Sequence, residues 1–150
     1  MDHSLAHIIA PMLKQLQATK HGAPNVDDED VPEELKATSA PELSEEDKNC
    51  GSPDANHFKR WDWVLNEMIW AFEQHNEDWE AQFSAGEIDH VMTPIDKNDN
   101  EVAKEDADYF RMDHGPNHTY EVDWDARKAY GERIQNGFRL FGKYYQNLWD

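Results

Sequence analysis

The chain has 150 residues, of which 32 are acidic and 14 basic, so its formal net charge is −18 at pH 7. This charge argues against direct binding to nucleic acid or to an anionic membrane, because both would repel it, and it favours a cationic partner. The single cysteine, Cys50, excludes an intramolecular disulfide and a cysteine-cluster metal site, and suits a reducing compartment. The length predicts one domain over residues 1–150. The lack of a basic, apolar leader and of 18 successive apolar residues predicts a cytoplasmic protein without a membrane span.

Residues 3–20 are predicted to form the first helix. Apolar side chains recur there at spacings of three and four, as one buried helix face requires. They are Leu5, Ile8, Ile9, Met12, Leu13 and Leu16. Pro11 removes a backbone donor and crowds the carbonyl of His7, which predicts either a kink at this point or a helix start nearer Ala10.

Residues 22–57 differ from the rest of the chain in composition. They hold eleven acidic residues, two lysines and four of the seven prolines, with only isolated apolar residues. Such a stretch is typical of an acidic loop or a disordered linker, and we expect it to contribute nothing to a core. Its carboxylates are the predicted partner-binding residues: Asp27, Asp28, Glu29, Asp30, Glu33, Glu34, Glu45, Glu46 and Asp47.

The second predicted helix begins near residue 57 and continues to about residue 83. Its buried face is expected to consist of Trp61, Val64, Leu65, Met68, Ile69 and Phe72. Trp63 and Trp70 fall beside this face, where they either widen the core or form a binding surface. Four glutamates of this stretch loosely resemble, in their spacing, the magnesium ligands of helical nucleotide pyrophosphatases, although a solvated acidic face fits them better. They are Glu67, Glu73, Glu77 and Glu80.

The stretch that follows predicts short strands. Segments 91–95 and 101–102 are expected to pair as a hairpin, with further short strands at 109–112 and 119–122. The turn of this hairpin has the spacing of the first ligands of a calcium-binding loop. However, Glu101 and Ala107 stand where such a loop needs a glycine and a bidentate glutamate, which excludes it.

The residues around Gly115 and Pro116 form the densest group of candidate metal ligands. This group consists of Asp113, His114, His118, Asp123 and Asp125. A divalent ion would bind there only if the loop folded back on itself. Because no three of these residues have helical or strand spacing, exposed histidines without a metal are the favoured interpretation.

Residues 125–149 are predicted to form the core helix of the fold, capped by Asp123 or Asp125. Its apolar positions recur at spacings of three and four: Tyr130, Ile134, Gly137, Phe141, Tyr144 and Leu148. The helix is also the only basic segment of the chain. Its cations either neutralise acidic segments of the same molecule, which is the favoured interpretation, or form an anion or nucleotide pocket with nearby aromatic rings. The residues of that pocket would be Arg133, Arg139, Lys143, Tyr145 and Trp149.

Three pieces of the chain, SLAHIIAPMLKQL, WDWVLNEMIWAFEQ and RIQNGFRLFGKYYQNLWD, resemble a family of small uncharacterised proteins found mainly in tailed phages and in some bacteria. The resemblance covers about half of the sequence. It implies a phage-type origin and a helical core, and it carries no settled activity. The long acidic stretch between the first two pieces is peculiar to this chain.

The sequence therefore predicts a mainly α fold. Three long helices, at about 3–20, 57–83 and 125–149, would pack as a bundle, with a small irregular or β-hairpin region before the last helix. No nucleotide-binding loop, nucleophile elbow or zinc helix is present, which favours a non-enzymatic binding protein without a cofactor or metal.

The favoured functional hypothesis is a phage accessory protein that inhibits or redirects a host factor. Its acidic surface, mimicking the charge of DNA, would bind a host protein with a basic surface, such as a nucleic-acid-binding protein, in the bacterial cytoplasm. One alternative is a nucleotide-binding protein that sequesters a signal on the basic face of the last helix. A second is a metal-dependent nucleotide hydrolase. The oligomeric state, including a homo-oligomer, stays open.

Overall fold

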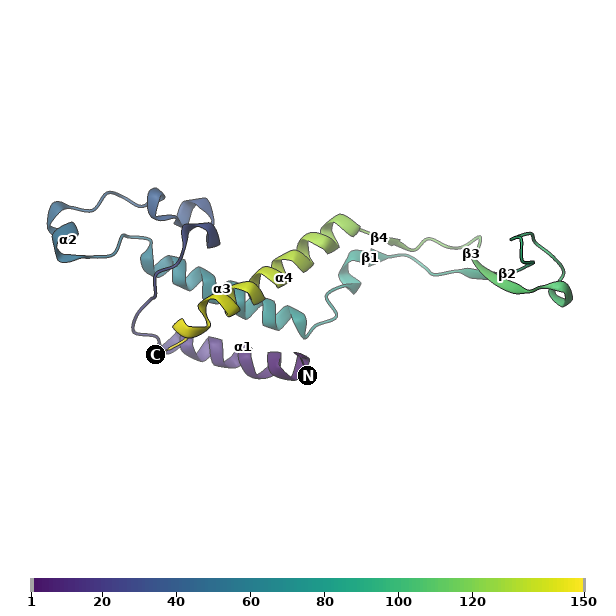
Figure 1. Cartoon of the computed structure of the whole chain (residues 1–150), viewed down its shortest axis with the longest axis horizontal. Helices are drawn as coiled ribbons and strands as arrows, with labels where there is room; N and C mark the ends of the chain where they lie inside the picture. The colour runs from purple at the N-terminus through teal and green to yellow at the C-terminus, as the bar shows by residue number, and fades with distance from the viewer. Residues whose placement is uncertain (1, 150) are drawn as a thin grey trace. The chain divides into compact units, whose positions relative to one another are not determined.

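The computed structural model describes residues 2–149. It is mainly helical and has three long helices, as the sequence predicts. These are α1 (Asp2–Thr19), α3 (His57–His75) and α4 (Trp124–Tyr144), joined by the short α2 (Glu45–Cys50) and by a β region before α4 (Figure 1). The chain forms two compact units, one from the residues up to Trp79 and from Lys128 onward, the other from Glu80 to Arg127.

The bounds of the long helices differ in detail from the prediction. The first helix passes through Pro11 without interruption, so a start nearer Ala10 is wrong. The second helix ends at His75, where the Asn76 N–H donates to the Glu73 carbonyl, and does not continue to residue 83. Residues 76–78 are Asn-Glu-Asp, and the low helix propensity of Asn and Asp accounts for this end.

The core is built on α3. Its predicted apolar face is buried as expected, with Trp61, Val64, Leu65, Met68, Ile69 and Phe72 all less than 9% exposed. Helix α4 crosses α3 (Figure 1) and adds Ile134, Leu140 and Tyr144 to the buried residues. A Cβ at Gly137 would overlap Ala71 of α3, so the missing side chain lets the two helices approach closely.

Helix α1 packs on α3 through a face that shares only three residues with the predicted one: Leu13 is buried, and Ile9 and Leu16 are partly buried against the core. Its buried residues are Ala6, Ala10 and Leu13. The predicted core residues Leu5, Ile8 and Met12 are exposed instead, by 49%, 57% and 66%. Small alanines allow the backbones of two helices to come close, and this favours the alanine face over the bulkier one.

The acidic segment is not excluded from the core, and this expectation was wrong. Val26 and Val31 are each 7% exposed and belong to the same apolar cluster as α3. Asp30 between them is buried as well. The segment carries short 3₁₀ turns at Asp28–Asp30, Glu33–Leu35 and Ala37–Ser39.

The second unit consists of two short antiparallel ribbons. Strand β2 (His90–Ile95) pairs with β3 (Tyr109–His114), and β1 (Ser84–Ala85) pairs with β4 (Glu121–Val122). The predicted hairpin between 91–95 and 101–102 forms only next to its turn, through a bridge from Ile95 to Glu101 and a hydrogen bond from the Val102 N–H to the Pro94 carbonyl, while β2 as a whole pairs with β3. All residues from 80 to 127 are described, and none of them is buried.

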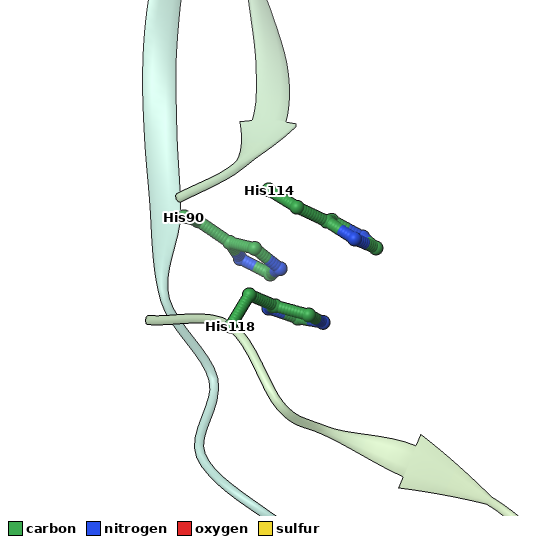
Figure 2. A group of neighbouring side chains, drawn as sticks. All are labelled: His90, His114 and His118. Atoms are coloured by element: carbon green, nitrogen blue, oxygen red, sulfur yellow. The ribbon is translucent and has the colours of Figure 1, made fainter. Parts of the chain in front are cut away.

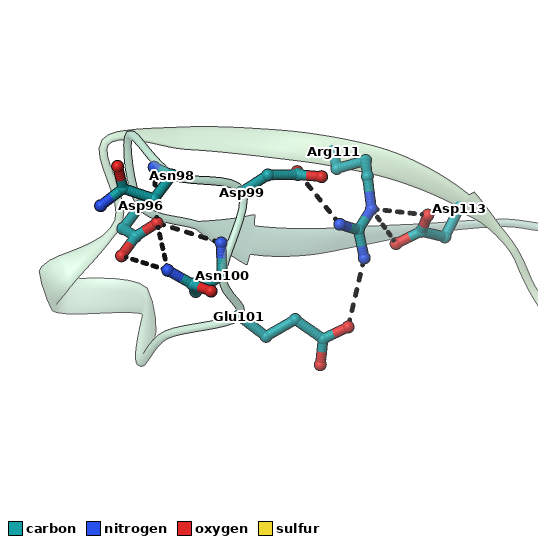
Figure 3. A network of polar contacts seen from close by, with 7 residues as sticks. All are labelled: Asp96, Asn98, Asp99, Asn100, Glu101, Arg111 and Asp113. Atoms are coloured by element: carbon teal, nitrogen blue, oxygen red, sulfur yellow. Dashed lines mark hydrogen bonds and ion pairs between the residues drawn. The ribbon is translucent and has the colours of Figure 1, made fainter.

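Two polar networks explain the actual pairing (Figure 3). The Asp96 carboxylate accepts hydrogen bonds from the backbone N–H groups of Asn98 and Asn100, which closes a tight turn directly after β2. Arg111 on β3 then binds the carboxylates of Asp113, Asp99 and Glu101. The segment between β2 and β3 is thus held against β3.

Among the described residues, no helix combines the length and apolarity needed to cross a membrane.

A candidate metal centre of three histidines

Three histidines meet at one end of the β2–β3 ribbon. His90 begins β2 and His114 ends β3, and the two are directly opposite each other in the strand register. His118 comes from the loop that follows β3. One ligand nitrogen from each ring lies within 4.8 Å of the other two (Figure 2). Such a group of imidazoles is the ligand type that zinc, copper and nickel prefer.

The loop after β3 is folded back by Asp89. Its carbonyl accepts from the Gly115 N–H at 2.8 Å, and its carboxylate accepts from the Asn117 N–H at 2.9 Å. A Cβ at position 115 would overlap this carboxylate, so only glycine permits the approach. These contacts of Asp89 bring His118 beside His90, which the sequence alone did not reveal.

The same residue orients the His118 ring. Its Nδ1 lies 3.1 Å from the Asp89 carbonyl oxygen and 3.2 Å from the Asp89 backbone nitrogen, so it donates to the oxygen when it carries the proton and accepts from the Asp89 N–H when it does not. A metal ion at Nε2 requires the tautomer with the proton at Nδ1. In this tautomer Nε2 keeps its lone pair for a metal ion. Metal-binding histidines commonly donate their second nitrogen in this way, which fixes both the tautomer and the ring orientation.

The rings lie nearly parallel to one another. The His114 and His118 centroids are 3.8 Å apart with an angle of 18° between the planes, and His90 lies 5.4 Å from His118 at 17°. Tetrahedral Zn²⁺ with bonds of about 2.0–2.1 Å needs nitrogen separations of about 3.3 Å. To bind one ion, the nearly parallel rings would have to rotate about their side-chain torsions, and the exposure of His90 and His114 leaves room for this.

The histidines line an open cleft of about 550 Å³ together with Glu121 and the apolar side chains of Ile88, Tyr120, Val122 and Trp124. Residues 80–127 hold 13 acidic and four basic residues, a formal charge of −9. This field attracts cations. One of the four basic side chains, Arg111, is held by three carboxylates, and it is the largest influence that lowers the pKa of Asp113.

The predicted loop cluster is therefore brought together only in part. His114 and His118 meet, whereas Asp113 turns to Arg111. Asp123 accepts from the Ala126 N–H at the start of α4, where Asp125 lies in the first turn, so Asp123 acts as the predicted helix cap. The third histidine, His90, was missed because the predicted hairpin paired the wrong strands.

The acidic segment lies on the basic face of α4. Asp30, whose side chain is 1% exposed, receives hydrogen bonds from Arg139 at 2.7 Å and from the Tyr144 hydroxyl at 2.6 Å. Lys143 binds Asp30, Asp27 and Glu29. Asp30 therefore does not belong to an accessible acidic surface. The cations of α4 neutralise carboxylates of the same chain.

The pKa values follow from this network. Burial is the largest influence on Asp30 and opposes its ionisation, but the hydrogen bonds from Lys143, Tyr144 and Arg139 together lower its pKa. Burial and the contact with Asp30 raise the pKa of Tyr144 to about 12. The carboxylates of Asp27 and Asp30, foremost among its partners, raise the pKa of Lys143.

The other predicted anion-binding cation is engaged as well. Arg133 donates to both carboxylate oxygens of Glu67, at 2.9 and 2.7 Å, and its guanidinium lies 3.8 Å from the centre of the Trp70 ring. Tyr145 and Trp149 are exposed by 64% and 56%. A phosphate group would have to displace carboxylates from Arg133, Arg139 and Lys143 before it bound them.

The remaining predicted acidic residues stay at the surface, with the exception of Asp28, which is partly buried and accepts from the Ala37 N–H. The exposed ones are Asp27, Glu29, Glu33, Glu34, Glu45, Glu46 and Asp47. The helical glutamates do not converge on one point. Glu73 pairs with Lys14, and Glu80 pairs with Arg127.

Comparison of the chain with models of known protein families, with curated proteins and with solved structures finds no match.

Proposed function

We propose that the protein binds a late first-row transition-metal ion through His90, His114 and His118. The observation that carries this proposal is the convergence of three imidazole nitrogens within 4.8 Å. Three histidines with an open fourth position form a common zinc-binding arrangement. The second unit would then be a metal-dependent binding module attached to a helical scaffold.

The metal has a structural task in this unit. Residues 80–127 are all described and have no buried side chain, and an isolated two-stranded ribbon is marginally stable at best in water. An ion held by β2, β3 and the loop after β3 would cross-link three segments of the chain. Metal-binding free energy becomes folding free energy when the site forms only in the folded state.

Isothermal titration of the untagged full-length protein with Zn²⁺ tests the proposal. We expect one ion per chain, and we expect single His90→Ala, His114→Ala and His118→Ala changes to lower affinity by more than about 100-fold, because each removes a ligand. The matched control is His21→Ala, since His21 is an exposed histidine outside the ribbon. Equal binding by the control and the three variants would refute the site.

Partner binding through the acidic segment is a second candidate function. It is favoured by the exposure of Glu33, Glu45 and Asp47, of which Glu33 pairs with Lys36 and Glu45 with Lys48 of the same segment. A phage accessory protein acting on a basic host factor, with the charge pattern of DNA, remains our hypothesis for this surface.

A change of Glu45, Glu46 and Asp47 to their amides tests this second function. Binding of a basic nucleic-acid-binding host protein should be lost in this variant and in high salt. The three changes leave the Asp30 network intact. Binding that persists in both conditions would argue against an electrostatic partner surface.

We further propose that α1, α3 and α4 pack as one bundle, supported by the packing of α1 and α4 on α3.

A further inference from the structure

Next to the histidines, the same ribbon carries a pair of methionines. Side chains alternate between the two faces of a strand, so His90 and Met92 of β2 share one face. In the register, His90 is opposite His114, and Met92 is opposite Met112. One face of the ribbon thus presents two histidines followed by two methionines, with His118 beyond the histidines.

These methionines are unusual in their exposure. Met92 is 56% exposed and Met112 is 60% exposed, whereas methionine is among the residues most often buried. Directly opposite residues of an antiparallel pair have Cβ atoms about 4.5–5.5 Å apart. Successive residues on one face of a strand lie about 6.6 Å apart, so each methionine is the next residue along that face from a histidine.

Thioether sulfur selects among metal ions. It is a soft ligand that binds Cu(I), while Mg²⁺ and Ca²⁺ take oxygen ligands and Zn²⁺ is satisfied by imidazole alone. Two exposed sulfur atoms beside three imidazoles therefore add a preference that the histidines alone do not have. The nearby carboxylates attract any cation and do not distinguish between metals.

We propose that the site takes Cu(I), held by imidazoles of the three histidines together with a thioether of Met92 or Met112, because a Cu(I) ion takes no more than about four ligands at once. This inference rests on the proposed metal-binding function and names the ion that the site prefers. The alternative without a metal ligand role is that the two methionines belong to an exposed apolar surface. Leucine distinguishes the two, because it keeps the apolar volume and removes the sulfur.

The experiment measures Cu(I) affinity under anaerobic conditions by competition with a chromophoric Cu(I) chelator. All proteins carry Cys50→Ser, because Cys50 is an exposed thiol that would bind Cu(I) by itself. We expect the double variant Met92→Leu/Met112→Leu to lower Cu(I) affinity at least about tenfold and to leave Zn²⁺ affinity within about twofold. The matched control is Met12→Leu, since Met12 is 66% exposed on α1.

A second readout does not depend on affinity. Ag(I) serves as a redox-inert probe for Cu(I), and the ¹³C methyl resonance of Met92, of Met112 or of both should shift on its addition while that of Met12 does not. Unchanged Cu(I) affinity and unshifted methyl resonances would overturn the inference. If Zn²⁺ binding still depended on the histidines in that case, the proposed metal-binding function would hold without the preference for Cu(I). If the histidine variants bound both Zn²⁺ and Cu(I) normally, both the metal-binding function and the preference for Cu(I) would be refuted.

Discussion

Gly137 of α4 lies directly against Ala71 of α3, and a Cβ at position 137 would overlap the Ala71 methyl group and approach the Glu67 carbonyl oxygen to 2.7 Å. The two helices cross where this side chain is missing. We predict that Gly137→Ala destabilises the protein by about 2 kcal/mol, because one contacting atom is backbone and cannot rotate away. Urea unfolding measures the change.

Gly142 of the same helix supplies the control. A Cβ at position 142 meets nothing within 4 Å. Gly142→Ala should therefore stabilise the protein by about 0.5–1 kcal/mol through helix propensity alone. Two substitutions of the same kind, five residues apart, are expected to act in opposite directions. Stabilisation by both would show that α3 and α4 do not approach closely.

The burial of Asp30 can be tested through the stability of the protein. Asp30→Asn removes the buried charge that Arg139 and Lys143 share, and the weakening of these charge-assisted hydrogen bonds costs about 2 kcal/mol. The matched change Glu29→Gln removes another partner of Lys143 that is 76% exposed, and it should cost less than about 1 kcal/mol. Equal losses in urea unfolding would contradict the burial of Asp30.

The stability of this network should depend on pH at both ends. The pKa of Asp30 is lowered on folding, so its contribution is present at neutral pH and is lost as the pH falls below about 4. The pKa of Tyr144 is raised to about 12, so its contribution is present below about pH 10 and is lost as the pH rises through 12.

Urea unfolding at pH 9 and pH 11 isolates the tyrosine. Between these values the wild-type protein should lose about 1 kcal/mol of stability that Tyr144→Phe does not lose, because the variant has no hydroxyl to ionise. The other four tyrosines are common to both proteins. A parallel loss in both would assign the alkaline effect to other groups.

Gly115 provides a test of the metal centre that leaves all three ligands in place. Gly115→Ala would push the Asp89 carboxylate away and release the loop that carries His118. We expect Zn²⁺ affinity to fall about 10- to 100-fold, as it does when a supporting group of a metal ligand is lost. Calorimetric titration measures this effect, with Gly142→Ala as the control expected to bind normally.

The helices around α3 were largely predictable from the sequence. The apolar positions of α3 recur with the helical period and are all buried, and the α4 positions Ile134, Gly137 and Tyr144 are buried as predicted. For α1 the period was right only in part, because Leu13 is buried and Ile9 and Leu16 pack against the core, whereas Leu5, Ile8 and Met12 are exposed. The buried alanines Ala6 and Ala10 carry too little apolar surface for the pattern of one helix to mark them.

The candidate site was less predictable because it depends on non-local pairing. His114 and His118 were identified as candidate ligands, but His90 joins them only through the register of β2 with β3. That register follows from the Asp96 turn and from the Arg111 contacts, which bridge residues as far as 12 positions apart. The burial of Asp30 depends in the same way on distant cations of α4.

The contacts of Asp30 also bear on how the chain folds. Its partners Arg139 and Tyr144 lie 109 and 114 residues away along the sequence. Contacts of such high sequence separation form late, since a long loop must close before they contribute. During synthesis the acidic segment therefore acquires its cations only after α4 has been made. The interval before this point is the period in which the chain is most open to proteolysis and to premature association.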